Sequence, residues 1–231
     1  MIRNDKKQKL KRSKSRKDSS TRWLQRQIND PFVHEAKKLG YRARSVFKLE
    51  EIDQRFGLVK SGMRILDLGA APGSWSQYAA RKGATIVAID LLPVEPVDGM
   101  VILQGDFLDP DMQERLRREL GGPADLVLSD IAPDATGRRI VDRLRAEQVG
   151  ETVLDFAAEV LREGGNAFLK LVKGAEHAVM QSARDRFRSL KPLRPKATRS
   201  ESSEIFILAS GRKARPTATG DADEGSDHSR A

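Results

Sequence analysis

Short apolar runs alternate with longer amphipathic stretches along the chain from residue 63 onward. Most of these runs are continuously apolar, as in "TIVAID" at 85–90, a pattern typical of strands that are covered on both faces of a sheet. The pattern predicts strands at 63–68, 85–90, 100–106, 125–130, 166–172 and 204–210, and helices near 75–82, 110–120, 140–162 and 175–188. This alternation predicts an open, mostly parallel, doubly wound α/β sheet.

Two helices are predicted before the first strand. Asp30 and Pro31 have the residue types of a helix start, and Gly40 follows two lysines as expected at a helix end. The second helix begins near Ser45 and ends at Gly57, and its apolar stripe consists of Val46, Leu49, Ile52 and Phe56. Lys48 lies about 40° from Ile52 on a helical wheel, so we expect it to border this stripe instead of pointing to solvent.

The two ends of the 231-residue chain differ from its middle in charge and apolar content. Residues 1–20 hold nine Lys/Arg against two Asp, a net charge of +7, whereas residues 214–231 have two Arg against four acids, a net charge of −2. Both segments are poor in apolar residues, so we expect a disordered basic arm at 1–20, one main domain at 21–213, and a disordered tail at 214–231. The arm is either a solubilising or cloning-derived extension or a segment that binds phosphate.

Composition excludes several classes of site. The chain has no Cys, which excludes disulfides, thiolate metal ligands and thiol nucleophiles, and its three His are scattered, so no metal site is expected. No window approaches the roughly 18 consecutive apolar residues of a membrane span, and no apolar segment follows the N-terminal cations as in a signal peptide. We therefore expect a cytoplasmic protein.

The turn after the first predicted strand, "LDLGAAPGSW" at 66–75, has the composition of a ligand-binding turn. Ligands of doubly wound sheets bind outside the carboxyl ends of the strands, and the first such turn usually lines that crevice. Gly69 and Gly73 allow close approach of a ligand and a positive φ. Their spacing is not the GxGxxG of dinucleotide-binding proteins, which argues against a nicotinamide-dependent oxidoreductase.

Carboxylates come at the ends of the first four predicted strands: Asp67, Asp90, Asp106 and Asp130. In a parallel sheet these ends share one rim, so we expect an acidic rim there. Such a rim would repel phosphate but suits a cationic ligand that carries hydroxyl and amino groups, such as S-adenosylmethionine. The alternative for any one of them is that the Asp side chain only caps a turn or a helix.

Five motifs in order, "DLGAAPGSWSQ", "DLLP", "QGDF", "SDIAP" and "FLKL", resemble the FtsJ family of methyltransferases. The resemblance runs from about Ser20 to Lys213. It implies a class I S-adenosylmethionine-dependent methyltransferase (Rossmann-like) fold, with a seven-stranded sheet, an antiparallel last strand and helices on both faces. It further implies methyl transfer to the ribose 2′-hydroxyl of a uridine in 23S rRNA, on the assembled large ribosomal subunit, by a protein expected to be a monomer.

The resemblance also implies site residues. The contacts to the cofactor would come from Gly73, Trp75, Asp90, Asp106 and Asp130. Two positions depart from the usual family pattern: Asp134 stands where bacterial members usually have Asn, and Lys173 where an aromatic residue or Gln is commoner. Both departures concern the side of the site that would face the RNA.

The family's catalytic tetrad maps onto Lys48, Asp130, Lys170 and Glu204. Lys170 interrupts an apolar strand near its carboxyl end, where an unpaired ammonium would be costly, unless its side chain extends to solvent at the sheet edge. Our hypothesis is that Lys170 is the general base, with Lys48 and Asp130 orienting it and the hydroxyl, and Glu204 holding one of the lysines. The pKa of a free Lys is about 10.4; burial and a second cation would lower it, whereas the acids would raise it.

Basic residues interleaved with aromatics precede the first strand. Arg42, Arg44 and Lys48 lie beside Tyr41 and Phe47, as expected where a nucleotide is stacked and its phosphates are held. The alternative is that Phe47 belongs to the core and the arginines are solvated. Two other functions stay open, a 2′-O-methyltransferase that acts on tRNA or an mRNA cap, and a catalytically silent rRNA-binding assembly factor.

Overall fold

The computed structural model describes residues 24, 25 and 27–214. The predicted basic arm at 1–20 lies outside the described residues, as does the predicted tail at 214–231 apart from Ala214. The boundaries predicted for the domain between them, 21 and 213, therefore stay predictions.

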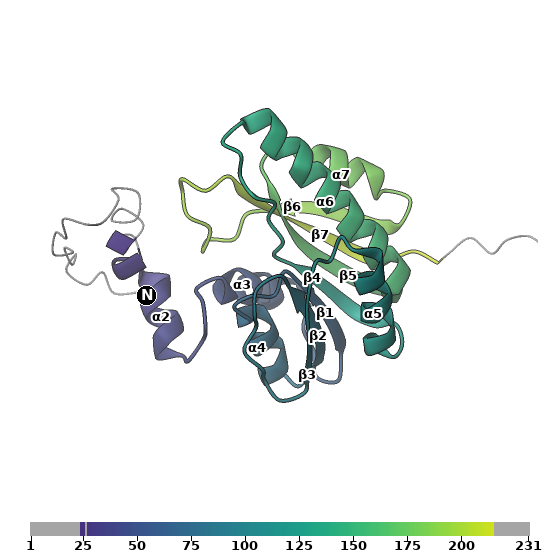
Figure 1. Ribbon diagram of the computed structural model, residues 1–231, viewed down its shortest axis with the longest axis horizontal. Helices are drawn as coiled ribbons and strands as arrows, with labels where there is room; N and C mark the ends of the chain where they lie inside the picture. Colours follow the sequence, from purple (N-terminus) through teal and green to yellow (C-terminus); the bar gives the residue numbers. More distant parts are fainter. Residues whose placement is uncertain (1–23, 26, 215–231) are drawn as a thin grey trace, which may run out of the picture.

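One seven-stranded sheet organises the fold, in the order β3-β2-β1-β4-β5-β7-β6 (Figure 1). Strands β1 to β5 pair in parallel, and β7 runs antiparallel to both β5 and β6. The strands are β1 (Arg64–Leu68), β2 (Thr85–Asp90), β3 (Met100–Gln104), β4 (Ala124–Ser129), β5 (Leu161–Val172), β6 (Phe187–Leu193) and β7 (Glu204–Arg212). The predicted fold class, including the antiparallel last strand, is confirmed.

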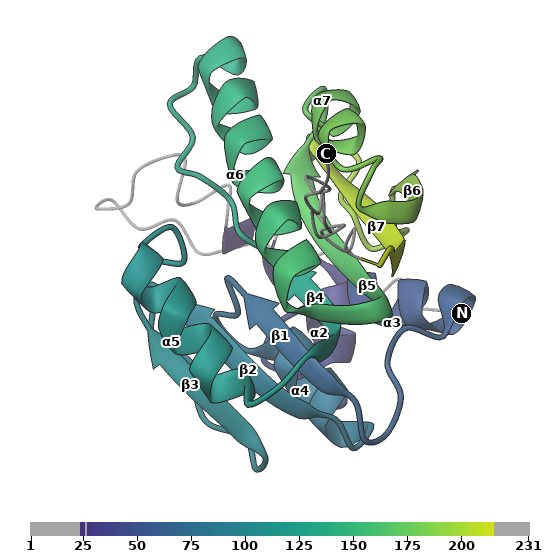
Figure 2. The ribbon, with the colours of Figure 1, turned by 90° about the vertical axis from the view of Figure 1, so that its right-hand side faces the viewer.

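Helices cover both faces of the sheet, with α3 and α4 on one side and α5, α6 and α7 on the other (Figure 1). The helices are α2 (Pro31–Lys38), α3 (Val46–Phe56), α4 (Ser74–Arg81), α5 (Pro110–Leu120), α6 (Arg139–Val160) and α7 (Glu176–Ser182). Figure 2 shows the long α6 running beside the strands from the other direction. The predicted layers and nearly all of their boundaries agree with this arrangement to within a few residues.

The core has two halves because successive side chains of a strand point to opposite faces. Leu66, Val127 and Leu169 contribute to the half under α5, α6 and α7. Their neighbours Ile65 and Phe168 contribute to the half under α3 and α4. Every central strand is therefore apolar on both faces, which explains the continuous apolar runs of the sequence.

The predicted ends of the two N-terminal helices agree with the structure. Asp30 caps α2 by accepting a 3.0 Å hydrogen bond from the backbone N–H of Phe32, and Gly57 ends α3 with φ at +63°, a conformation that favours glycine. Val46, Leu49 and Ile52 are fully buried in the α3 stripe, but Phe56 at its end is exposed. The buried stripe is thus shorter than the sequence predicted.

The predicted helix at 175–188 is wrong in its second half. Helix α7 ends at Ser182, and Phe187–Leu193 form strand β6. This strand is at the edge of the sheet and pairs only with β7. Phe187 is its one buried residue, and it includes Pro192, which is tolerated in an edge strand. Its sequence therefore lacks the continuous apolar run that marks the buried strands.

No helix within residues 24–25 and 27–214 is long and apolar enough to cross a membrane. In the same residues, no group of three or more His, Asp or Glu side chains is placed to hold a metal ion.

Candidate active site

A cleft of about 550 Å³ opens at the carboxyl ends of the parallel strands. Its size is within the range of small-molecule sites. The turn after β1 contributes Gly69 and Ala71, and the segment after β4 contributes residues 130–134. The charged residues that line it are Asp90, Asp106, Asp130, Asp134 and Lys170. The cleft is therefore strongly acidic, as the sequence predicted for this edge of the sheet.

Turns hold two of these carboxylates in place. Both oxygens of Asp90 accept backbone hydrogen bonds of 2.8 Å, one from Ala71 and one from Leu92. Asp106, which lies two residues beyond the end of β3, accepts a 2.9 Å hydrogen bond from the backbone N–H of Leu108. The capping role and the ligand-binding role that the sequence left as alternatives are compatible here, because a carboxylate oxygen can accept more than one hydrogen bond.

Asp67 does not belong to this rim. It lies inside β1, is fully buried, and accepts a 2.5 Å hydrogen bond from the Ser76 hydroxyl of α4. Its second oxygen has no hydrogen-bond partner among the described residues. The pKa of Asp67 is raised to about 7. Burial is the main cause, the charges of Asp130 and Asp90 act in the same direction, and the Ser76 hydrogen bond opposes them.

Gly73 and Trp75, the other two predicted cofactor contacts, are not among the residues that line the cleft. Gly73 precedes α4 with φ at +96°, and a Cβ atom there would come within 2.5 Å of the Arg42 guanidinium. The Trp75 side chain is 3% exposed, and its ring lies 5.5 Å from that of Phe168 and 6.2 Å from that of Phe206. Its role in this structure is to pack the core beneath α3 and α4.

Three of the four predicted catalytic residues project from the face of the sheet that α3 covers, and the fourth comes from α3. Leu128, Phe168 and Phe206 all contribute to the core under α3 and α4. Residues two positions away along a strand point to the same face, which places Asp130, Lys170 and Glu204 there. Lys48 comes from α3 itself, so four separate elements supply the tetrad.

These residues form two ion pairs. The Lys170 ammonium lies 2.8 Å from a carboxylate oxygen of Asp130 and donates a 2.5 Å hydrogen bond to the carbonyl of the same residue. The Lys48 ammonium lies 2.6 Å from a carboxylate oxygen of Glu204. The sequence had left open which lysine Glu204 would hold, and in the structure it is Lys48.

The pKa of Glu204 reflects both lysines. Burial acts to raise it, but the charge and hydrogen bond of Lys48, together with the charge of Lys170, hold the pKa of this carboxyl below its usual value. Glu204 is therefore ionised at neutral pH. Lys48 is 7% exposed, so its ammonium depends on this one carboxylate for compensation.

The two arginines predicted to face RNA are engaged within the protein. Arg42 donates hydrogen bonds of 2.6 and 3.0 Å to the carbonyls of Glu95 and Pro96. Arg44 lies 3.1 Å from Asp30 and donates to the Ala197 carbonyl. These contacts favour a structural role for both side chains. Phe47 is partly buried and packs against Phe32 and the core, close to the alternative that the sequence left open.

Sequence analysis missed a positioning residue near the tetrad. Asp30 is 9% exposed and forms ion pairs with two arginines, Arg44 at 3.1 Å and Arg199 at 2.9 Å. It thus joins the start of α2 to the connection between β6 and β7, which leads into Glu204. The sequence offered only its capping position as a signal, because the partner Arg199 is far away along the chain.

The arrangement can hold a cationic small molecule in the cleft while Lys170 faces a second reactant at its edge. A family model described as "FtsJ-like methyltransferase" matches residues 41–212. The chain belongs to this family. The match covers the cleft and all four tetrad residues.

Members of the family with similar sequences are called ribosomal RNA large subunit methyltransferase E. The protein of that name from Gluconobacter oxydans is 48% identical over 204 residues, which cover 87% of this chain and 76% of the relative. That from Rhodopseudomonas palustris is 50% identical over 200 residues, 84% of each chain. A crystal structure described as a ribosomal RNA methyltransferase from Plasmodium falciparum covers 76% of this chain and 100% of its own, with a TM-score of 0.67 and 24% identity, and shows the shared fold.

We expect Asp67→Asn to remove a pH dependence of stability. Because the folded state raises the pKa of Asp67 to about 7, it binds a proton that the unfolded state has lost, and stability falls as pH rises from about 4 to 7. The difference in the free energy of unfolding between wild type and Asp67→Asn should change by up to roughly 4 kcal/mol over this pH range. Denaturant unfolding at pH 4 and pH 8 measures it. The exposed Asp98→Asn is the control, and parallel profiles for wild type and Asp67→Asn would contradict the expectation.

We expect Trp75→Phe to retain affinity for the methyl donor, since the Trp75 side chain packs in the core. Trp75→Ala should instead lower the free energy of unfolding by about 3–5 kcal/mol through the cavity it leaves. Calorimetric titration with S-adenosylmethionine and denaturant unfolding separate the two effects. A large loss of donor affinity in a stable Trp75→Phe variant would instead assign the side chain to the donor site.

Proposed function

We propose that the protein transfers a methyl group from S-adenosylmethionine to the ribose 2′-hydroxyl of a uridine in 23S rRNA, on the assembled large ribosomal subunit, in the cytoplasm. The observation that carries this proposal is the pair of lysines held by Asp130 and Glu204, with Lys170 directly at the wall of the acidic cleft. The names of the relatives support rRNA as the substrate. The resemblance of the motifs supports the 2′-hydroxyl and the uridine.

The cleft fits such a donor in charge and size. When bound, S-adenosylmethionine supplies a methyl group on a positively charged sulfonium, together with ribose hydroxyls and amino groups. Asp90, Asp106 and Asp130 line the 550 Å³ cleft, and their carboxylates can accept hydrogen bonds from such hydroxyl and amino groups. Leu91, Leu92 and Leu108 line the same cleft and are largely exposed, so they provide apolar surface for a planar ring.

Lys170 is the residue best placed to act on the acceptor. It lines the cleft, and its side chain is 12% exposed. In our proposal the Lys170 ammonium first loses a proton to solvent, and the neutral amine then takes the proton of the ribose hydroxyl as its oxygen bonds to the methyl carbon, while the bond from that carbon to sulfur breaks and the sulfonium would leave as a neutral thioether. Asp130 orients Lys170, and Glu204 holds Lys48 beside them. Alignment of the two reactants by this fixed group contributes to the rate.

Two alternatives differ from this proposal in substrate or in chemistry. A methyltransferase for tRNA or for an mRNA cap would use the same four residues. A silent rRNA-binding assembly factor would not need them, and the complete set of Lys48, Asp130, Lys170 and Glu204 in two close ion pairs argues against it.

Incubation with radiolabelled S-adenosylmethionine tests the substrate. We expect label in large ribosomal subunits that lack the modification, mapped by nuclease digestion to one uridine and resistant to alkaline hydrolysis as a 2′-O-methyl group is. Bulk tRNA and capped mRNA are the comparison substrates. Label in tRNA alone would replace the proposed substrate, and no label in any RNA would favour the silent factor.

Lys170→Ala should lower kcat by roughly 10²–10⁴-fold, the range of general acid–base catalysis, while donor affinity stays nearly unchanged. Single-turnover methylation and calorimetric titration with S-adenosylmethionine measure the two quantities. Lys191→Ala, on the exposed edge strand β6, is the matched control for loss of a lysine. Retained turnover in Lys170→Ala would refute the assignment of the base.

A further inference from the structure

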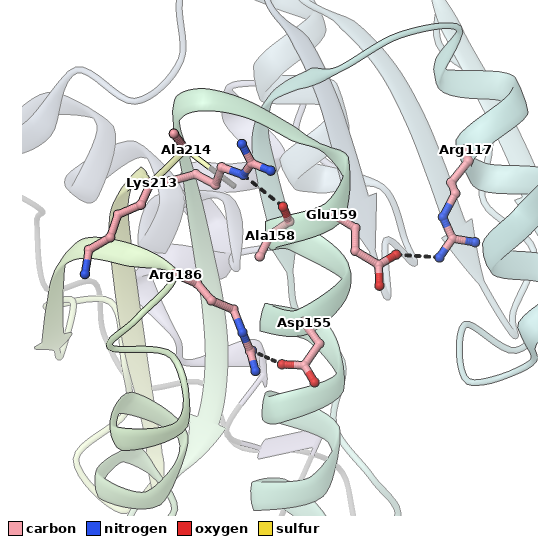
Figure 3. Close-up of a pocket in the computed structure, with 8 residues that line it drawn as sticks. Arg117, Asp155, Ala158, Glu159, Arg186, Lys213 and Ala214 are labelled. Atoms are coloured by element: carbon pink, nitrogen blue, oxygen red, sulfur yellow. Dashed lines mark hydrogen bonds and ion pairs between the residues drawn. The ribbon is translucent and has the colours of Figure 1, made fainter. Parts of the chain in front are cut away.

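A second cleft, of about 640 Å³, is lined by residues at the ends of α6 and β7 (Figure 3). It therefore lies at the amino end of β5. Helix α6 ends here and β5 begins here, whereas the candidate active site is at the carboxyl end of β5. Its lining is almost entirely charged: Arg117, Asp155, Glu159, Arg186, Arg212 and Lys213. Strand β7 connects the two sites, with Glu204 at its first position and Arg212 at its last.

Both carboxylates of this cleft are paired with arginines. Arg117 lies 2.6 Å from Glu159, and Arg186 pairs with Asp155 (Figure 3). The lining therefore holds four cations and two anions. The excess positive charge belongs to the last two residues of the fold, Arg212 and Lys213.

Arg212 and Lys213 contact only carbonyls within the described residues. The Nε of Arg212 donates a 2.9 Å hydrogen bond to the Ala158 carbonyl, and the Lys213 ammonium donates one of 2.8 Å to the Arg184 carbonyl. Neither forms an ion pair with a carboxylate in residues 24–25 and 27–214. The bond from Nε fixes the guanidinium of Arg212 and leaves its two Nη groups, the pair that binds a phosphate or carboxylate in two-point fashion, for a ligand.

We propose that this cleft binds a backbone phosphate of the RNA substrate, at a distance from the methylated nucleotide. The two excess positive charges of the lining make an anionic partner the natural occupant, and the net charge of +9 of the whole chain favours a polyanion. Eight residue steps of β7 separate Glu204 from Arg212, roughly 26 Å at 3.3 Å per residue. The contact therefore reaches a part of a large folded RNA other than the modified nucleotide. This inference rests on the proposed function, because it takes the substrate to be the large subunit.

The test compares the salt dependence of binding to large ribosomal subunits for wild type, Arg212→Gln, Lys213→Gln and Lys60→Gln. Lys60 is exposed just before β1, at the same edge of the sheet but outside the cleft, so it controls for loss of one charge. Arg212→Gln and Lys213→Gln should each reduce the slope of log affinity against log salt by about 0.7–1, the value for one phosphate contact. Lys60→Gln should leave the slope unchanged.

Arg212→Lys keeps the positive charge, so it should keep most of the slope of log affinity against log salt. This variant therefore shows whether a reduced slope in Arg212→Gln comes from the lost charge or from a disturbed fold. For Lys213→Gln, kcat at saturating subunits should equal that of wild type while KM rises. Slopes equal to wild type in both cleft variants would overturn the inference, as would an equal change in Lys60→Gln. A cross-link from a photoreactive residue at Ala214 to the chain's own acidic residues instead of to RNA would assign the cleft to the C-terminal segment.

Failure of this inference is distinguishable from failure of the proposed function. If wild type does not methylate subunits, the function fails whatever the slopes are. If wild type methylates them and the slopes do not differ, only the second RNA contact is refuted.

Discussion

Two lysines that need a carboxylate partner fix the arrangement of the site. Burying an ammonium without a partner is costly, and removing one member of a buried pair leaves the other uncompensated. Lys48 on α3 meets this requirement only if β7 brings Glu204 against it. Lys170 on β5 meets it only beside the residue that follows β4. The two pairs therefore hold α3 against β7 and the end of β4 against β5. If α3 packed in another position, Lys48 and Glu204 would lose their partners, which would destabilise the fold.

The acids of the site have different tasks although the sequence presents them alike. Asp90 and Asp106 are held by backbone N–H groups at the wall of the cleft. Asp130 faces Lys170. Asp67 lies one layer below, inside β1, where burial raises its pKa to about 7. A carboxyl that is readily protonated adds less negative charge beneath a rim that already carries several carboxylates, so the fourth acid is compatible with the other three.

The local pattern of apolar and capping residues was enough to predict most helices and strands. It failed where contacts between residues distant in sequence determine the structure or the role of a side chain. The buried strands, the glycine turn and the helix ends follow from apolar runs and capping residues, and each was predicted nearly at its observed position. Strand β6 was missed because an edge strand that pairs on one side needs no continuous apolar run. The roles of Trp75 and Asp30 were not visible because their partners, Phe206 and Arg199, are distant in sequence. The four tetrad positions were predicted from the motifs, and the structure brings them together in two ion pairs, which no hydrophobic periodicity in the sequence could have indicated.

The start of α3 shows how the acidic cleft and the two paired lysines come to share one framework. The Trp75 indole N–H donates a 2.9 Å hydrogen bond to the Ser45 carbonyl, and the hydroxyls of Ser45 and Ser74 lie 2.7 Å apart. These contacts join α3 to the helix that begins directly after the glycine turn. Lys48 is one turn further along α3. A displacement of the glycine turn would therefore move Lys48 as well. Since Glu204 holds Lys48 from the other side of the site, the acidic cleft and the two paired lysines are positioned by the same set of contacts.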